Sequence, residues 1–103
     1  MVEDPELRRL LWFVLGGARG GENRARIIDW LSKRPSNLNQ LAAALGVDYR
    51  TVMHHVGVLK RNSLIMAEGS GYGVTYFVSP RLEANMEIFK EICRKLRYNL
   101  AGG

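Results

Sequence analysis

The sequence predicts one mainly helical α+β domain over residues 1–103, with a helix-turn-helix, a β-hairpin and a long C-terminal helix in that order. Two apolar helical repeats meet at Gly46, a residue suited to a left-handed turn. The segment 69–73 holds three glycines between two runs of β-type residues, as a tight hairpin turn requires. Apolar residues then recur every three or four positions toward the C-terminus, which indicates a helix with one apolar side.

Two helices are expected before this motif, over residues 1–15 and 22–34. Asp4 followed by Pro5 is typical of a helix start, since aspartate caps the free backbone donors and proline fits the first turn. The second helix should stop before Pro35, which cannot continue it. Glycines between the two helices make a short connection.

The helix-turn-helix is predicted over residues 39–62. Asn39 is expected to cap its first helix, Gly46 to reverse the chain, and Asp48 to cap its second helix. The alternative is a helical hairpin with no ligand, and the β-type residues directly after Asn62 argue against it. The expected buried stripe of the second helix is Val52, Val56 and Leu59.

A two-stranded hairpin is predicted over residues 64–78, and one long helix over residues 81–99. The hairpin follows the helix-turn-helix directly, as the wing of a winged helix-turn-helix does. The final helix is expected to carry a heptad-like apolar stripe: Leu82, Met86, Phe89, Cys93, Leu96 and Leu100.

Positive charge gathers in the middle of the chain. The formal net charge is +5, and the one acid between residues 30 and 67 is Asp48. Such segregation favours a face that binds a polyanion over an evenly charged surface. The basic residues of that stretch are Lys33, Arg34, Arg50, Lys60 and Arg61.

The run from Asn39 through Tyr76 resembles the winged helix-turn-helix of ArsR- and MarR-like prokaryotic regulators. Residues 51–60, Thr-Val-Met-His-His-Val-Gly-Val-Leu-Lys, resemble the Thr-Val-x-x-His-Leu-x-x-Leu run of the ArsR-like group. Arg24 and Ile27 fit the first core helix of that group, and the segments 16–24 and 72–76 resemble an archaeal branch of it. The resemblance implies a transcriptional regulator. The cysteine pairs of metal-sensing members are missing, which excludes sensing through them.

The second helix of the motif is expected to lie in the DNA major groove, where base edges can be told apart. Arg50 is the main candidate for a base contact, because its guanidinium can bond O6 and N7 of one guanine together. The side opposite the apolar stripe carries the expected base contacts: Tyr49, Arg50, Met53 and His54.

Other polar residues are expected to contact phosphates, which position the protein without reading sequence. Gly57 either lets the backbone approach DNA closely or is a tolerated weak point of the helix. The expected backbone contacts are Asn39, Thr51, Lys60, Arg61, Ser70 and Tyr72.

Two features suggest a metal or redox role, and a structural role is favoured for both. His54 and His55 are neighbours on a helix, so they point about 100° apart and do not readily chelate one ion. His55 is expected to make a structural hydrogen bond, and Cys93 to pack in an apolar stripe. A His/carboxylate metal site at a dimer interface remains open, but no metal or cofactor is assigned.

A homodimer is expected, because one copy of this size would read half of a pseudo-palindromic operator. The alternative is that the two terminal helices pack on their own domain. The predicted interface residues are Leu7, Leu11, Trp12, Leu15, Met86, Phe89, Cys93 and Leu96.

The sequence therefore predicts a cytoplasmic regulator that binds double-stranded DNA, with no membrane partner, no catalytic site and an unknown effector. One rival function is a winged helix used as a protein-interaction module of transcription or replication machinery. A second is a wing that binds RNA or single-stranded nucleic acid through exposed aromatic side chains, of which the hairpin turn offers one, Tyr72.

Overall fold

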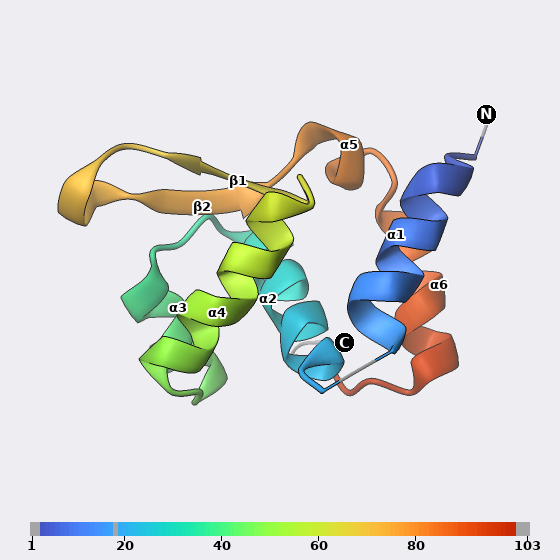
Figure 1. The fold of residues 1–103 in the computed structure, drawn as a ribbon, viewed down its shortest axis with the longest axis horizontal. Coiled ribbons are helices and arrows are strands. Elements are labelled where there is room, and N and C mark those ends of the chain that lie inside the picture. The colour runs from blue at the N-terminus through green and yellow to red at the C-terminus, as the bar shows by residue number, and fades with distance from the viewer. Residues whose placement is uncertain (1–2, 18, 101–103) are drawn as a thin grey trace.

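The computed structural model describes residues 3–17 and 19–100, and its principal extents are 38 × 24 × 23 Å. Six helices and a two-stranded sheet make up this part of the chain (Figure 1). None of the described helices is long and apolar enough to cross a membrane. The elements are α1 (Pro5–Gly16), α2 (Gly21–Lys33), α3 (Leu38–Leu45), α4 (Tyr49–Arg61), β1 (Ile65–Glu68), a 3-10 turn η1 (Gly71–Gly73), β2 (Thr75–Val78), α5 (Pro80–Glu83) and α6 (Met86–Leu96).

The helix-turn-helix is confirmed, with one correction at its start. The cap of α3 is Asn37 and not Asn39: Asn37 accepts from the Gln40 amide and the Gln40 side chain accepts from the Asn37 amide, both at 2.8 Å. Asn37 is the better cap because a glutamine, Gln40, stands three residues later and completes the reciprocal pair of hydrogen bonds. Gly46 ends α3 with φ 66°, and Asp48 accepts from the Thr51 amide at 3.2 Å to begin α4.

The predicted hairpin is also confirmed. β1 and β2 pair antiparallel, from Ile65 opposite Val78 to Glu68 opposite Thr75. Gly69 turns the chain with φ 99°, and a side chain there would place its Cβ 2.5 Å from the Gly73 carbonyl oxygen. The hairpin extends from the helical body beyond α3 and α4, in the position of a wing (Figure 1).

The single C-terminal helix predicted over residues 81–99 is wrong, because the chain forms α5 and α6 with a break between them. Asn85 causes the break: its side-chain amide donates to the Arg81 carbonyl oxygen at 2.8 Å, the acceptor that its own backbone amide would use in a continuous helix. The Asn85 backbone amide bonds Leu82 instead. At the other end α6 stops at Leu96, where Arg97 adopts φ 60° and turns the chain back.

Five of the eight residues predicted for the dimer interface lie in the core of their own chain. α1 packs against both α2 and α6 (Figure 1). Most apolar side chains of the two terminal helices are therefore buried within one chain. A partner chain cannot reach these side chains without opening the core. Trp12, Met86 and Leu96 are half-buried against that core. The five core residues are Leu7, Leu11, Leu15, Phe89 and Cys93, each exposed by 3% or less.

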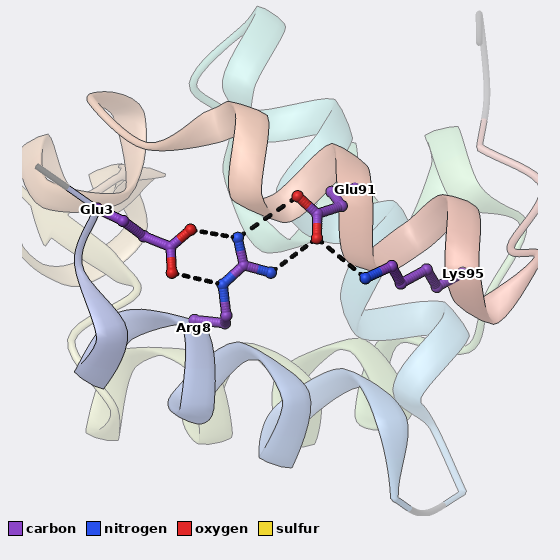
Figure 2. A network of polar contacts seen from close by, with 4 residues as sticks. All are labelled: Glu3, Arg8, Glu91 and Lys95. Atoms are coloured by element: carbon purple, nitrogen blue, oxygen red, sulfur yellow. Dashed lines mark hydrogen bonds and ion pairs between the residues drawn. The ribbon is translucent and has the colours of Figure 1, made fainter. Parts of the chain in front are cut away.

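Ion pairs tie the N-terminal segment to the C-terminal helices. Figure 2 shows the guanidinium of Arg8 between two carboxylates, that of Glu3 and that of Glu91 on α6. The Arg8–Glu91 contact is 2.8 Å, and Lys95 reaches the same carboxylate at 3.1 Å. The hydrogen bond from Arg8 and, to a smaller extent, that from Lys95 lower the pKa of Glu91 from 4.5 to about 2. The network thus fixes α1 against α6.

Candidate nucleic-acid interface

α4 separates an apolar side from an exposed side, as its sequence predicts. Tyr49 is 43% exposed and Met53 48%, which is high for such large side chains. Arg50 and His54 are also exposed. The four residues predicted to contact bases therefore share the solvent side of one helix. The buried side consists of Val52, His55, Val56 and Leu59.

A groove joins the start of α3, the start of α4 and the hairpin. Its volume is about 170 Å³, and its lining includes Asn39, Tyr49, Gly71 and Tyr76. Asn39 is exposed in the first turn of α3, and the side chain that caps this helix is that of Asn37. The fold thus brings Asn39 beside Tyr49, ten positions further along the chain.

The other residues predicted to contact phosphates differ in how accessible they are. Lys60 and Arg61 are exposed in the last turn of α4, and Ser70 is exposed at the hairpin tip. Thr51 is half-buried and its hydroxyl lies 3.5 Å from the Asp48 carboxylate, so it belongs to the helix cap. The side chain of Tyr72 lies outside the described residues.

The basic residues of the middle segment fall into two groups in space. Arg50, Lys60 and Arg61 belong to α4, which carries no acid between its ends. At the end of α2, Lys33 pairs with Asp29 at 3.3 Å and Arg34 stacks 4.2 Å from the ring centre of Trp30. The positive charge available on the helix-turn-helix itself therefore comes from the first group.

His55 is held inside the protein by Arg24 of α2. The Arg24 guanidinium donates from Nη1 to Nδ1 of His55 at 3.2 Å and from Nε to the Val14 carbonyl oxygen at 2.8 Å. Both side chains are buried. Gly20 lies against the ring, where a Cβ would come within 2.3 Å of the imidazole. The predicted structural hydrogen bond of His55 is confirmed.

Burial and two neighbouring side chains favour the neutral form of His55. Burial lowers its pKa below the ordinary 6.5, and the charges of Arg24 and His54 lower it further. Arg24 has only donors, so Nδ1 must be unprotonated to accept its bond. His54 and His55 meet edge to face, with ring centres 5.3 Å apart.

Cys93 is a packing residue of α6, as predicted. Its side chain is 3% exposed, and burial raises the pKa of its thiol to about 11. A thiol in this state carries no charge at neutral pH and is a poor nucleophile.

Sequence reasoning missed two arginines that hold the motif in place. Arg24 was noted for its resemblance alone, and Arg26 donates to the Leu45 carbonyl oxygen at the end of α3, at 2.8 Å. A signal for Arg24 was present, since it stands on the apolar side of α2 with Ile27, Ile28 and Leu31. A cation in such a stripe is either buried with partners or placed at an edge.

No family model and no curated protein matches the chain. Solved structures do match. HlyU from Vibrio cholerae N16961 has a TM-score of 0.66 at 17% identity, over 88% of this chain and 97% of that one. The antimony-specific repressor AntR has a TM-score of 0.68 at 20% identity, over 88% and 78%. Mb0332 from Mycobacterium bovis, a homodimeric winged helix-turn-helix DNA-binding domain, has a TM-score of 0.64 at 20% identity, over 91% and 88%.

At these identities the likeness is one of fold, and the fold of this chain is the winged helix-turn-helix. Its neighbours include transcriptional regulators described as of ArsR or MarR type. The organisms named above are bacteria, so the archaeal branch suggested by the sequence has no support among them.

Proposed function

We propose that this protein is a sequence-specific, double-stranded-DNA-binding transcriptional regulator that acts in the cytoplasm as a homodimer. One observation carries the proposal: α4 presents Tyr49, Arg50, Met53 and His54 on its solvent side while its other side is fixed in the core. A helix so presented fits the major groove. The proposal assigns no catalytic activity.

Each residue has a defined role in this proposal. Arg50 bonds a guanine, Met53 packs on a thymine methyl, and Tyr49 and His54 bond base edges or phosphates. Lys60 and Arg61 contact the phosphate backbone of the DNA and displace its counterions, so DNA binding weakens steeply as the salt concentration rises. Asn39 and Ser70 reach the flanking phosphates from α3 and the wing.

A revised surface is proposed for the dimer. Phe13 is 75% exposed on α1, on the side turned away from the core. The half-buried Trp12, Met86 and Leu96 supply further apolar surface on the same terminal helices. Support also comes from Mb0332, which is described as homodimeric. Two copies would set their α4 helices about 34 Å apart, one turn of DNA, and read a pseudo-palindrome.

Selection of bound duplexes from a random pool tests the function. The expected product is a pseudo-palindromic consensus whose half-sites lie about one helical turn apart. Parallel selection with Arg50→Ala should lose the preference at one position of each half-site. A pool that shows no enrichment with the folded wild-type protein would reject sequence-specific binding and favour the protein-interaction function.

A further inference from the structure

A cavity lies on α2, α6 and the returning C-terminal segment. Its volume is about 510 Å³, within the range of sites for small organic ligands. α2 contributes Asp29 and Lys33, and α6 contributes Lys90, Cys93 and Arg94. None of these five residues belongs to the proposed DNA face.

The outer wall of the cavity is held in place by specific bonds. Arg97 adopts φ 60°, a conformation that is unfavourable for a residue with a side chain. This conformation turns residues 98–100 back over the cavity. The Tyr98 amide donates to the Cys93 carbonyl oxygen at 3.1 Å. The Tyr98 hydroxyl donates to the carbonyl oxygen of Leu15 at the end of α1.

The lining combines positive charge with apolar surface. The Arg94 guanidinium makes no hydrogen bond or ion pair with any side chain in residues 3–17 and 19–100, and Lys90 lies 3.9 Å from an exposed Glu87. Among the described residues of the lining the one acid is Asp29, which is paired with Lys33 at 3.3 Å. The apolar part includes the Cys93 thiol, whose raised pKa keeps it uncharged, and Leu100.

We propose that this cavity binds a small organic anion, a carboxylate or sulfonate with an apolar ring or chain, and that this ligand is the effector of the regulator. Arg94 and Lys90 pair with the anionic group, while Leu100 and the Tyr98 ring contact the apolar body. The regulatory part of the proposal rests on the proposed function.

A chain of contacts leads from the cavity to the helix that reads DNA. Tyr98 bonds the Leu15 carbonyl, and the preceding carbonyl, that of Val14, accepts from Arg24. Arg24 in turn bonds His55 on α4. A ligand that shifts Tyr98 thus acts on α4 through the end of α1. By thermodynamic reciprocity, DNA must then change the affinity for the ligand by the same factor.

The binding site is tested with 1-naphthalenesulfonate and its neutral analogue 1-naphthalenesulfonamide, by calorimetry and by amide NMR shifts. The sulfonate should bind and shift the amides of residues 90–100, and the sulfonamide should bind more weakly. Arg94→Gln should weaken sulfonate binding about two- to fivefold, as expected for a pair at a solvent-exposed rim. Lys95→Gln is the matched control, because Lys95 points to Glu91 and does not line the cavity. Equal loss in both variants, equal binding of the two probes, or shifts confined to other residues would overturn the site.

The regulatory part is tested with the duplex enriched by selection. Saturating sulfonate should change the affinity of the wild-type protein for that duplex. Tyr98→Phe keeps the ring but loses the bond to Leu15, so it should bind the probe while its DNA affinity no longer responds. Unchanged wild-type affinity for DNA at saturating probe would reject the effector role. If selection yields no duplex, the proposed function fails, whereas the probe measurements still decide the site.

Discussion

Arg24 brings a positive charge into the protein and is held there by neutral acceptors. In residues 3–17 and 19–100 no acidic side chain forms an ion pair with its guanidinium, which relies on the Val14 carbonyl and on His55. A buried charge is costly unless its donors are satisfied. Protonation of His55 at Nδ1 would remove one acceptor and add a second positive charge next to the first.

A pH dependence of stability follows from the lowered pKa of His55. As the pH falls below 6.5, the unfolded chain takes up a proton on this residue before the folded chain does, so the free energy of unfolding should decrease. The stabilisation is present above pH 6.5 and is lost as the pH falls through the lower pKa of the folded state. Losses from Glu91 and Asp4 come later, below their ordinary pKa values of 4.5 and 3.8.

Urea denaturation of the wild type and of His55→Asn at several pH values checks this prediction. Asparagine offers an uncharged acceptor to Arg24 and does not titrate. Its stability should therefore change less between about pH 7.5 and about pH 5.5, the interval around the ordinary pKa of histidine. The same slope in both proteins would show that His55 does not govern the acid response.

Arg50 and Lys60 should differ in how their loss affects DNA binding. Arg50→Ala should cost about 1–3 kcal/mol on the preferred duplex and relax the preference at one base pair. Lys60→Ala should weaken all duplexes about equally and reduce the salt slope by about one. Fluorescence anisotropy on the selected duplex and on its single-base variants separates the two. An Arg50→Ala protein with unchanged affinity and preference would place the reading side elsewhere.

The sequence predicted the exposed side of α4 well, because the helical period alone sorts Arg50 and Met53 from Val52 and Val56. It could not pair Arg24 with His55, since the two stand 31 positions apart and meet only in the fold. The sequence also grouped Lys33 and Arg34 with the DNA face, because they are close in sequence to the helix-turn-helix. Their partners, Asp29 and Trp30, lie on α2, and this is visible only in the fold.

At the scale of the element, Gly57 is the weak point of α4. Among the described residues, a Cβ at this position would meet one atom, Nη1 of Arg61 at 3.3 Å, and that end of a flexible side chain can move. Gly57→Ala should therefore raise the free energy of unfolding by up to about 1 kcal/mol, the helix-propensity difference. Thermal or urea denaturation measures it, and a loss of stability would contradict the prediction.

DNA binding by the same variant decides between the two roles of Gly57. Lower affinity in a more stable protein would identify a close approach of the backbone to DNA. Unchanged affinity would identify a glycine that the helix merely tolerates. Ala44→Gly, on the exposed surface of α3, is a control for helix propensity in the opposite direction.

Element boundaries were predictable where a local signal is unambiguous. Asp4 and Pro5 start α1, and Gly46 and Asp48 form the turn, because each acts on backbone groups a few residues away. The break before α6 was missed since Met86 remains in phase with the apolar stripe. Apolar periodicity gives no information about Asn85, whose side-chain amide competes with its own backbone amide for the Arg81 carbonyl oxygen.

At the scale of the whole molecule, the proposed dimer depends on the terminal helices. Apolar spacing cannot say whether a stripe is covered by its own chain or by a partner. The fold covers most of the predicted stripe internally and leaves Phe13 exposed on α1. The proposed dimer therefore depends on Phe13 far more than on the core leucines of the same helix.

Phe13→Glu should convert the dimer to a folded monomer, because a carboxylate on each copy would be buried against an apolar contact. Sedimentation analysis gives the mass, and circular dichroism confirms the fold. Met66→Glu is the matched control, since Met66 is 44% exposed but lies on β1 of the wing. A Phe13→Glu protein that stays dimeric would place the interface on another surface.

The buried state of Cys93 makes the chain well suited to optical study. It is the only cysteine in the sequence, and with a thiol pKa of about 11 it reacts slowly with maleimides near neutral pH. A cysteine introduced at Met66, which is 44% exposed on β1 and has no assigned DNA contact, would consequently take a fluorophore on the wing while the native thiol stays in place. Wing movement on DNA could then be followed one molecule at a time, in a protein altered at a single position.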